Sequence, residues 1–204
     1  MNQKAFQDYY PDDLSHCYGC GRLNEFGLQI KSYWDGEETV CTFFPRPYHT
    51  AIPGYVYGGL IASLIDCHGT GTAAAAAYRA EGRPMDTEPP LRYVTASLHV
   101  DFLRPTPIGV PLEIRGRVKE IKGRKVVVDA TLSAEGEVCA RGQVVAVQLP
   151  EQMMPGKAKS QFSPPGGFEP PGRVKSSMSR DVGPRHPGPI RVTRTPPCLP
   201  SPRG

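Results

Sequence analysis

The feature that most constrains the fold of this chain is one strongly apolar helix that begins with a glycine pair and contains a single carboxylate. Apolar residues follow helical spacing from Gly58 to about Ala80, and the later half is rich in small residues. The adjacent Gly58 and Gly59 leave backbone N–H groups uncovered at the helix start, where the helix dipole favours negative charge. Asp66 lies about two turns further on, among apolar residues, where an ionisable group is unfavourable unless it is paired or used. This combination is suited to the hydrolysis of an acyl ester or thioester.

Six runs around this helix have the composition and turn residues of β-strands. Two short runs precede the helix and four longer runs follow it, and the last two have hairpin spacing. The runs cover residues 28–31, 38–44, 93–102, 111–121, 125–133 and 138–149. One apolar helix must be buried against such a sheet. The sequence therefore predicts an α+β fold in which an antiparallel sheet wraps around one long central helix.

The composition of the chain changes sharply near residue 155. The last 50 residues contain 12 prolines and 7 glycines without apolar periodicity, which predicts a disordered tail. This tail carries 9 basic and 2 acidic residues, which leaves 15 basic and 18 acidic residues in 1–154. The basic balance of the chain therefore does not indicate a nucleic-acid-binding domain. The expected organisation is an N-terminal extension over 1–13, one domain over 14–150 and a Pro/Gly-rich basic tail over 151–204.

The cysteines and the lack of long apolar runs bear on the compartment. No run of about eighteen apolar residues and no secretory signal is found, so we expect no membrane contact and reduced thiols in a cytoplasmic protein. Cys17 and Cys20, beside His16, have the spacing of half a zinc site, but no second ligand pair at finger spacing follows. Three further cysteines in apolar runs are expected to be small core residues, namely Cys41, Cys67 and Cys139. We therefore expect no metal site and no cofactor.

Five short motifs follow one another in a fixed order around the helix. They are Cys17-Tyr18-Gly19-Cys20-Gly21, His49 with Pro53 to Gly59, Asp66, Thr95 to Phe102 with Arg104-Pro105, and Gly123-Arg124-Lys125. In this order they resemble the hotdog-fold acyl-CoA thioesterases, in particular the PaaI-like group and its mitochondrial relatives. The resemblance covers about residues 14–150, and it implies a hotdog fold for this domain.

The resemblance also implies a catalytic site. Asp66 corresponds to the catalytic carboxylate of the family, the backbone N–H of Gly58 to the oxyanion donor, and Thr95 to the residue that faces the reaction centre. Asp66 would activate water against a thioester carbonyl, or attack the carbonyl itself to give an anhydride. The residues alone also allow structural roles: a buried hydrogen-bonded carboxylate, close packing at the glycine pair, and a β-branched residue that suits a strand.

Six residues are expected to bind the substrate: His49, Tyr57 and Gly59 in the pocket, and Arg104, Lys122 and Arg124 at the phosphates of coenzyme A. The alternatives are an exposed loop histidine for His49 and a solvated hairpin turn for the basic residues. Tyr57 stands where the family usually has histidine, a change that leaves the backbone donor of Gly58 intact and bears on substrate preference and rate. His68 lies about 200° around the helix from Asp66, so a structural role is expected for it.

The function implied by the resemblance is that of an acyl-CoA thioesterase of fatty acid metabolism. Such a protein would form a homodimer or homotetramer, with active sites at the interface between two chains, and its edge strand would be covered by the second chain. One alternative is a non-catalytic hotdog protein that binds acyl-CoA or lipid. Another is an enoyl-CoA hydratase of the hotdog fold, which is disfavoured because the chain lacks an Asp…His pair at the spacing typical of those enzymes.

Overall fold

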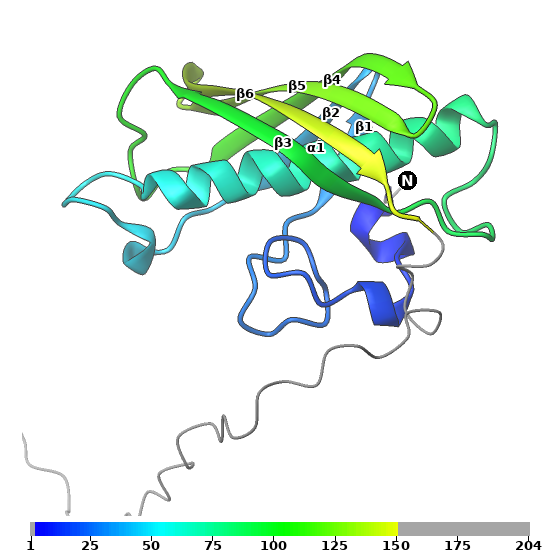
Figure 1. The fold of residues 1–204 in the computed structure, drawn as a ribbon. Coiled ribbons are helices and arrows are strands. Elements are labelled where there is room, and N and C mark those ends of the chain that lie inside the picture. The colour runs from blue at the N-terminus through cyan, green and yellow to red at the C-terminus, as the bar shows by residue number, and fades with distance from the viewer. Residues whose placement is uncertain (1–2, 151–204) are drawn as a thin grey trace, which may run out of the picture. The chain divides into compact units, whose positions relative to one another are not determined.

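Helix α1, Gly58–Ala80, runs along one face of a six-stranded antiparallel sheet (Figure 1). The computed structural model describes residues 3–150. The strands are β1 Ser32–Asp35, β2 Glu38–Phe43, β3 Tyr93–Phe102, β4 Leu112–Lys122, β5 Lys125–Ala134 and β6 Glu137–Gln148, and three short 3-10 helices precede α1, namely η1 Phe6–Tyr9, η2 Asp12–Leu14 and η3 Pro47–His49. The strand order is β1-β2-β4-β5-β6-β3, so β1 and β3 are the edges of the sheet. This arrangement confirms the predicted α+β fold with a sheet around one helix.

The first strand begins later than the sequence predicts. β1 starts at Ser32, whereas the composition predicts a strand over 28–31. The backbone of that stretch has another partner, because the N–H of Leu28 donates to the carbonyl of Tyr18 at 2.7 Å. Residues 28–31 are therefore held by the cysteine-containing loop rather than by the sheet.

Helix α1 is buried along most of its length because small side chains let the sheet approach it closely. Leu64 and Ile65 are fully buried in the core, where a large aliphatic side chain contributes about 1.5–3 kcal/mol. A Cβ atom at Gly69 would lie 2.5 Å from a methyl group of Val144 on β6. Glycine at position 69 therefore serves close packing between the helix and the sheet.

A chain of buried polar side chains connects α1 to the N-terminal segment and to the first two strands. Gln7 donates to the hydroxyl of Ser32 at 3.1 Å, and this hydroxyl lies 2.9 Å from His68 Nδ1. On the other side, His68 Nε2 lies 3.1 Å from the hydroxyl of Thr39, which is 2.6 Å from that of Thr72. Burial lowers the pKa of His68 to about 4, so the imidazole is neutral near pH 7. His68 therefore has the structural role that its position on the helix predicts.

The N-terminal segment before the first strand packs against the core. Phe6 of η1 is buried and packs edge-on against Trp34, with ring centroids 5.5 Å apart, so η1 contributes a side chain to the core. The predicted tail over 151–204 lies outside the described residues. Within residues 3–150, no helix combines the length and the apolar character that crossing a bilayer requires.

Candidate active site

Asp66 and Thr95 meet at the junction between α1 and the edge strand β3. The Thr95 hydroxyl donates a hydrogen bond to Asp66 Oδ1. Thr95 lies at an irregularity in the pairing of β3 with β6, where one extra residue is inserted before Ser97. Such a bulge changes the direction of neighbouring side chains and is common beside active sites. The structure therefore brings together two of the three residues for which the sequence predicts a catalytic role.

The surroundings of Asp66 suit a base. Its side chain is half-buried, and this burial raises the pKa of Asp66 above its ordinary range. The hydrogen bond from Thr95 acts in the opposite direction, and the nearby Cys17 raises the pKa further. Thr95 occupies only part of the hydrogen-bonding capacity of the carboxylate, which therefore retains lone pairs for a water molecule.

The start of α1 offers free backbone donors. Tyr57 precedes the helix in an extended conformation, and its side chain makes no capping hydrogen bond to the first turn. The first N–H groups of a helix have no partner within it and can face a developing negative charge. A Cβ at Gly59 would lie 2.4 Å from the Tyr57 ring, so a larger residue there would displace this exposed side chain. A Cβ at Gly58 would make only ordinary contact with Phe102, at 3.4 Å.

The glycine pair and the carboxylate are well separated along α1. Gly58 and Asp66 are eight residues apart on α1, which at 1.5 Å per residue corresponds to about 12 Å. An oxyanion donor lies about 3 Å from the carbonyl oxygen, and a general base lies about 3 Å from the water molecule that attacks the carbonyl carbon. The helical spacing therefore places Gly58 and Asp66 of one chain at separate points along α1.

Three of the predicted substrate-binding residues line one groove. This groove of about 860 Å³ extends between the loop over 18–29 and the start of α1, and His49, Tyr57 and Gly59 form part of its wall. His49 stacks on Phe43 with ring centroids 5.7 Å apart. Burial, together with the charge of a neighbouring arginine, lowers the pKa of His49, which keeps the imidazole neutral near pH 7. His49 is therefore part of a cavity wall rather than an isolated loop side chain.

The three basic residues predicted to meet phosphates do not gather in one place. Arg104 follows β3 and forms an ion pair with Glu137. Lys122 and Arg124 lie at the β4–β5 turn, where Arg124 donates to the carbonyl of Gln148 at 2.6 Å. The strand pairing places this turn at the same end of the sheet as the first residues of β3, with β6 between them, whereas Arg104 lies beyond the last residue of β3. The ten residues of β3 span about 33 Å, so one chain presents these charges at opposite ends of the strand.

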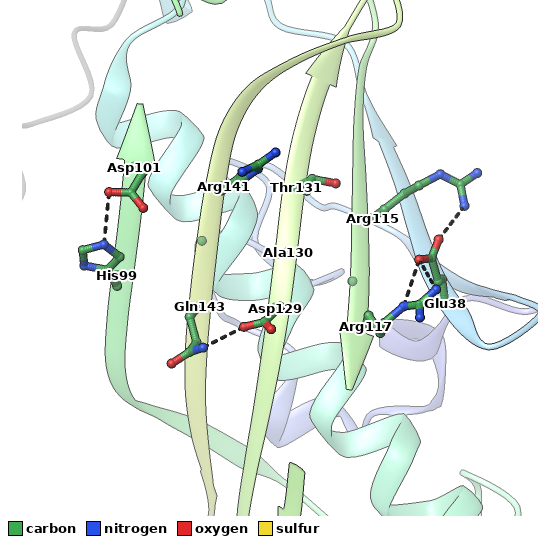
Figure 2. A pocket seen from close by; sticks show the side chains of 12 residues that line it. Glu38, His99, Asp101, Arg115, Arg117, Asp129, Ala130, Thr131, Arg141 and Gln143 are labelled. Atoms are coloured by element: carbon green, nitrogen blue, oxygen red, sulfur yellow. Dashed lines mark hydrogen bonds and ion pairs between the residues drawn. The ribbon is translucent and has the colours of Figure 1, made fainter. Parts of the chain in front are cut away.

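Another cavity, of about 550 Å³, lies on the face of the sheet opposite α1 (Figure 2). Some of its charged side chains pair with one another, as Figure 2 shows for Glu38 with Arg117 at 3.1 Å and for His99 with Asp101 at 3.1 Å. Exposed pairs of this kind contribute little to stability. The site residues predicted from the sequence, all of them within residues 3–150, lie elsewhere.

The structure assembles one group that sequence reasoning missed. The thiols of Cys17, Cys20 and Cys67 lie within 4.8 Å of one another. Contacts with the other two thiols, Cys20 foremost, lower the pKa of Cys17. The Cys-x-x-Cys spacing marks the first two residues as a pair, but no spacing rule connects them to Cys67 on α1. The prediction of an ordinary core cysteine at position 67 therefore omits its main contacts.

Comparison with known proteins identifies the family. A family model described as the thioesterase superfamily matches residues 53–141. A thioesterase superfamily protein from Shewanella loihica PV-4, known from its crystal structure, is 52% identical; the match covers 69% of this chain and 100% of that chain, with a TM-score of 0.53. The chain belongs to the thioesterase superfamily. Its sheet and central helix are the hotdog fold that the sequence resemblance predicts.

Two further relatives of this thioesterase superfamily chain carry the name acyl-coenzyme A thioesterase THEM4. The protein from Xenopus laevis is 39% identical over 87 residues, which are 43% of this chain and 33% of that protein. The protein from Rattus norvegicus is 31% identical over 123 residues, which are 59% of this chain and 47% of that protein. The chain therefore spans between a third and a half of the length of these two relatives.

Proposed function

We propose that this chain is an acyl-CoA thioesterase, which hydrolyses an acyl-CoA to the free acid and coenzyme A. The observation that carries the proposal is the hydrogen bond between the half-buried Asp66 on an apolar helix and the exposed Thr95 on an edge strand. Asp66 accepts a proton from a water molecule, and the water oxygen attacks the thioester carbonyl carbon. The C–S bond then breaks, the proton held by Asp66 passes to the sulfur, and coenzyme A leaves as its thiol. The names of the THEM4 relatives support acyl-CoA as the substrate class.

The active site in this proposal is shared between two copies of the chain. The distance of about 12 Å between Gly58 and Asp66 supports a site in which Asp66 and Thr95 of one copy face Gly58 of the second copy. The N–H of Gly58 would stabilise the oxyanion of the tetrahedral intermediate, a contribution of about 3–4 kcal/mol for such a donor. Pairing of two chains within one dimer, or in a dimer of dimers, provides this arrangement.

The edge strand β3 supports the dimer. Among the strands of residues 3–150 it pairs on one side only, with β6, and three large apolar side chains on it are exposed, namely Val94, Leu98 and Phe102. An unpaired strand edge with exposed apolar residues is a template for another strand. Antiparallel pairing of β3 with its copy would cover this edge. It would also bring the Arg104 end of one chain toward the Arg124 end of the other, where both could meet the phosphates of coenzyme A.

The first test measures release of free thiol from short, long and aryl acyl-CoA substrates. Changing Asp66 to Asn should lower kcat by about 100-fold or more while acyl-CoA still binds, because the base is lost and the shape is kept. Asp129→Asn on the outer face of the sheet is the matched control and should leave turnover unchanged. Near-normal turnover in a folded Asp66→Asn protein contradicts the proposal. Binding of acyl-CoA by the wild-type chain without thiol release supports the non-catalytic alternative, and hydration of crotonyl-CoA without thiol release supports the hydratase.

A second test distinguishes a shared site from a site within one chain. Gly58→Pro removes the backbone donor, and proline is tolerated at the first position of a helix when an extended residue precedes it, as Tyr57 does. Asp66→Asn and Gly58→Pro proteins are each expected to be inactive, whereas mixed dimers recover one site with both native groups. Gly58→Ala keeps the donor and is the control. Mixed dimers without recovered turnover would show that the two groups do not act across the interface.

A further inference from the structure

The three neighbouring thiols connect two parts of the chain that are distant in sequence. Cys17 and Cys20 belong to the loop before β1, and Cys67 belongs to α1 beside Asp66. Gly19 lies between the two loop cysteines, and a Cβ at this position would lie 2.3 Å from Cys67 Sγ. The loop therefore approaches the helix so closely that only glycine fits there. The close approach places the sulfur atoms of both segments around one point.

The spacing of the sulfur atoms matches a metal site better than a disulfide. The Sγ atoms of Cys17 and Cys67 are 3.7 Å apart, and those of all three cysteines lie within 4.8 Å of one another. Two sulfurs bound at about 2.3 Å to one tetrahedral zinc ion lie about 3.8 Å apart. A disulfide needs a sulfur separation of about 2.05 Å and would use two of the thiols while leaving the third without a role. A single cation would be bound by all three thiolates.

The surroundings of the cluster suit a centre with net negative charge. Three thiolates around a divalent cation leave one negative charge, and the guanidinium of Arg92 lies beside Cys20. Arg92 is held in place by stacking on the ring of Tyr10, with its guanidinium carbon 3.8 Å from the ring centroid. Such groups next to the ligands orient and stabilise a metal centre. Cys20 and Cys67 are buried, whereas Cys17 is exposed and provides access from solvent.

We propose that Cys17, Cys20 and Cys67 bind one thiophilic cation of the Zn²⁺ class, which fastens the cysteine-containing loop to α1. Among residues 3–150, no further His, Cys, Asp or Glu joins this group, so a solvent molecule completes the tetrahedral coordination. The cation would hold the loop over 18–29, which forms one wall of the substrate groove, against the helix that carries Asp66. The site is thus structural in this proposal and lies outside the hydrolytic chemistry.

The test uses the reduced, chelator-treated full chain and Co²⁺ as an optical probe in the absence of oxygen. We expect intense visible bands of tetrahedral cobalt and a thiolate-to-cobalt charge-transfer band, both saturating at one equivalent and both abolished by Zn²⁺. Cys17→Ala and Cys67→Ala should each lose the charge-transfer band and the one-equivalent end point. Cys139→Ala, which removes a buried thiol outside the cluster, is the matched control and should titrate as the wild type does.

A measurement on the unmodified chain keeps the proposal testable where a variant fails to fold. Zn²⁺ should slow alkylation of Cys17 by a maleimide, as mapped by mass spectrometry, and should raise the melting temperature. Absence of cobalt bands and of protection in the folded, reduced chain would overturn the proposal. Formation of a disulfide among the three thiols by mild oxidation, again without metal binding, would overturn it in favour of a redox pair. None of these measurements involves a thioester, so their outcome is independent of the proposed activity.

Discussion

Lowering the pH from about 7 to 4 is expected to weaken the fold through one buried side chain, His68. Both of its ring nitrogens lie within hydrogen-bonding distance of buried hydroxyl groups, those of Ser32 and Thr39, and burial lowers its pKa to about 4 from an ordinary value of 6.5. Between these two values the unfolded chain binds a proton that the folded chain does not. The contribution of neutral His68 to stability is therefore fully present above pH 6.5 and is lost as the pH falls. The loss amounts to about 2 kcal/mol at pH 5 and about 3 kcal/mol below both pKa values.

The assay is urea unfolding of the wild type and of His68→Gln across this pH range. The variant lacks the titrating group, and all other groups are common to both proteins and cancel in the difference between the two unfolding free energies. At pH 7 the variant should be less stable, by about 1–3 kcal/mol, because hydroxyl groups in the buried network lose a partner. This difference should shrink by about 2 kcal/mol on going to pH 5.

The control for this experiment is His99→Gln, which removes an exposed histidine on the outer face of the sheet. Its unfolding free energy should follow that of the wild type at every pH. If the unfolding free energies of the wild type and of His68→Gln fell in parallel from pH 7 to 5, His68 would have the same pKa in the folded and unfolded chains. That result would refute the reasoning.

Three further predictions concern the groove, the catalytic pair and the tail. Tyr57→His should keep or raise turnover and change the ranking of acyl groups, because the ring lines the groove while the donor at Gly58 stays. For the same reason Tyr57→Ala should raise KM more than it lowers kcat. Loss of turnover in a folded Tyr57→His protein would give the tyrosine a chemical role. Thr95→Val should lower kcat with little change in melting temperature, because valine suits an exposed strand but donates no hydrogen bond to Asp66. Unchanged kinetics would exclude Thr95 from the site. A chain that ends at residue 156 should keep its melting temperature and kcat, since the removed segment lacks apolar periodicity; a large loss of stability would show that the tail docks.

Local sequence signals determined most of the elements of this fold. The apolar spacing and the glycine pair predict a helix from Gly58 to about Ala80, and α1 has these bounds. The β4–β5 turn contains Gly123, whose φ of +55° suits glycine, and the β5–β6 hairpin lies where the sequence predicts it. Such signals depend on neighbours within a few residues. The 12 Å separation of Gly58 and Asp66 also follows from the helical spacing alone.

Contacts between segments that are distant in sequence determined the features that local sequence patterns do not predict. Residues 28–31 have strand-like composition, yet they bond to the loop around Tyr18, and this places the start of β1 at Ser32. Cys67 lies in an apolar run like any core cysteine, and only the docking of a glycine-containing loop onto α1 places it beside Cys17. A residue's own neighbours in sequence set its backbone conformation, whereas its chemical partners depend on which surfaces the whole chain buries together. The helix and the β5–β6 hairpin of this protein could therefore be predicted from its sequence. The thiol cluster and the His68 network form only when distant segments pack together in the tertiary structure.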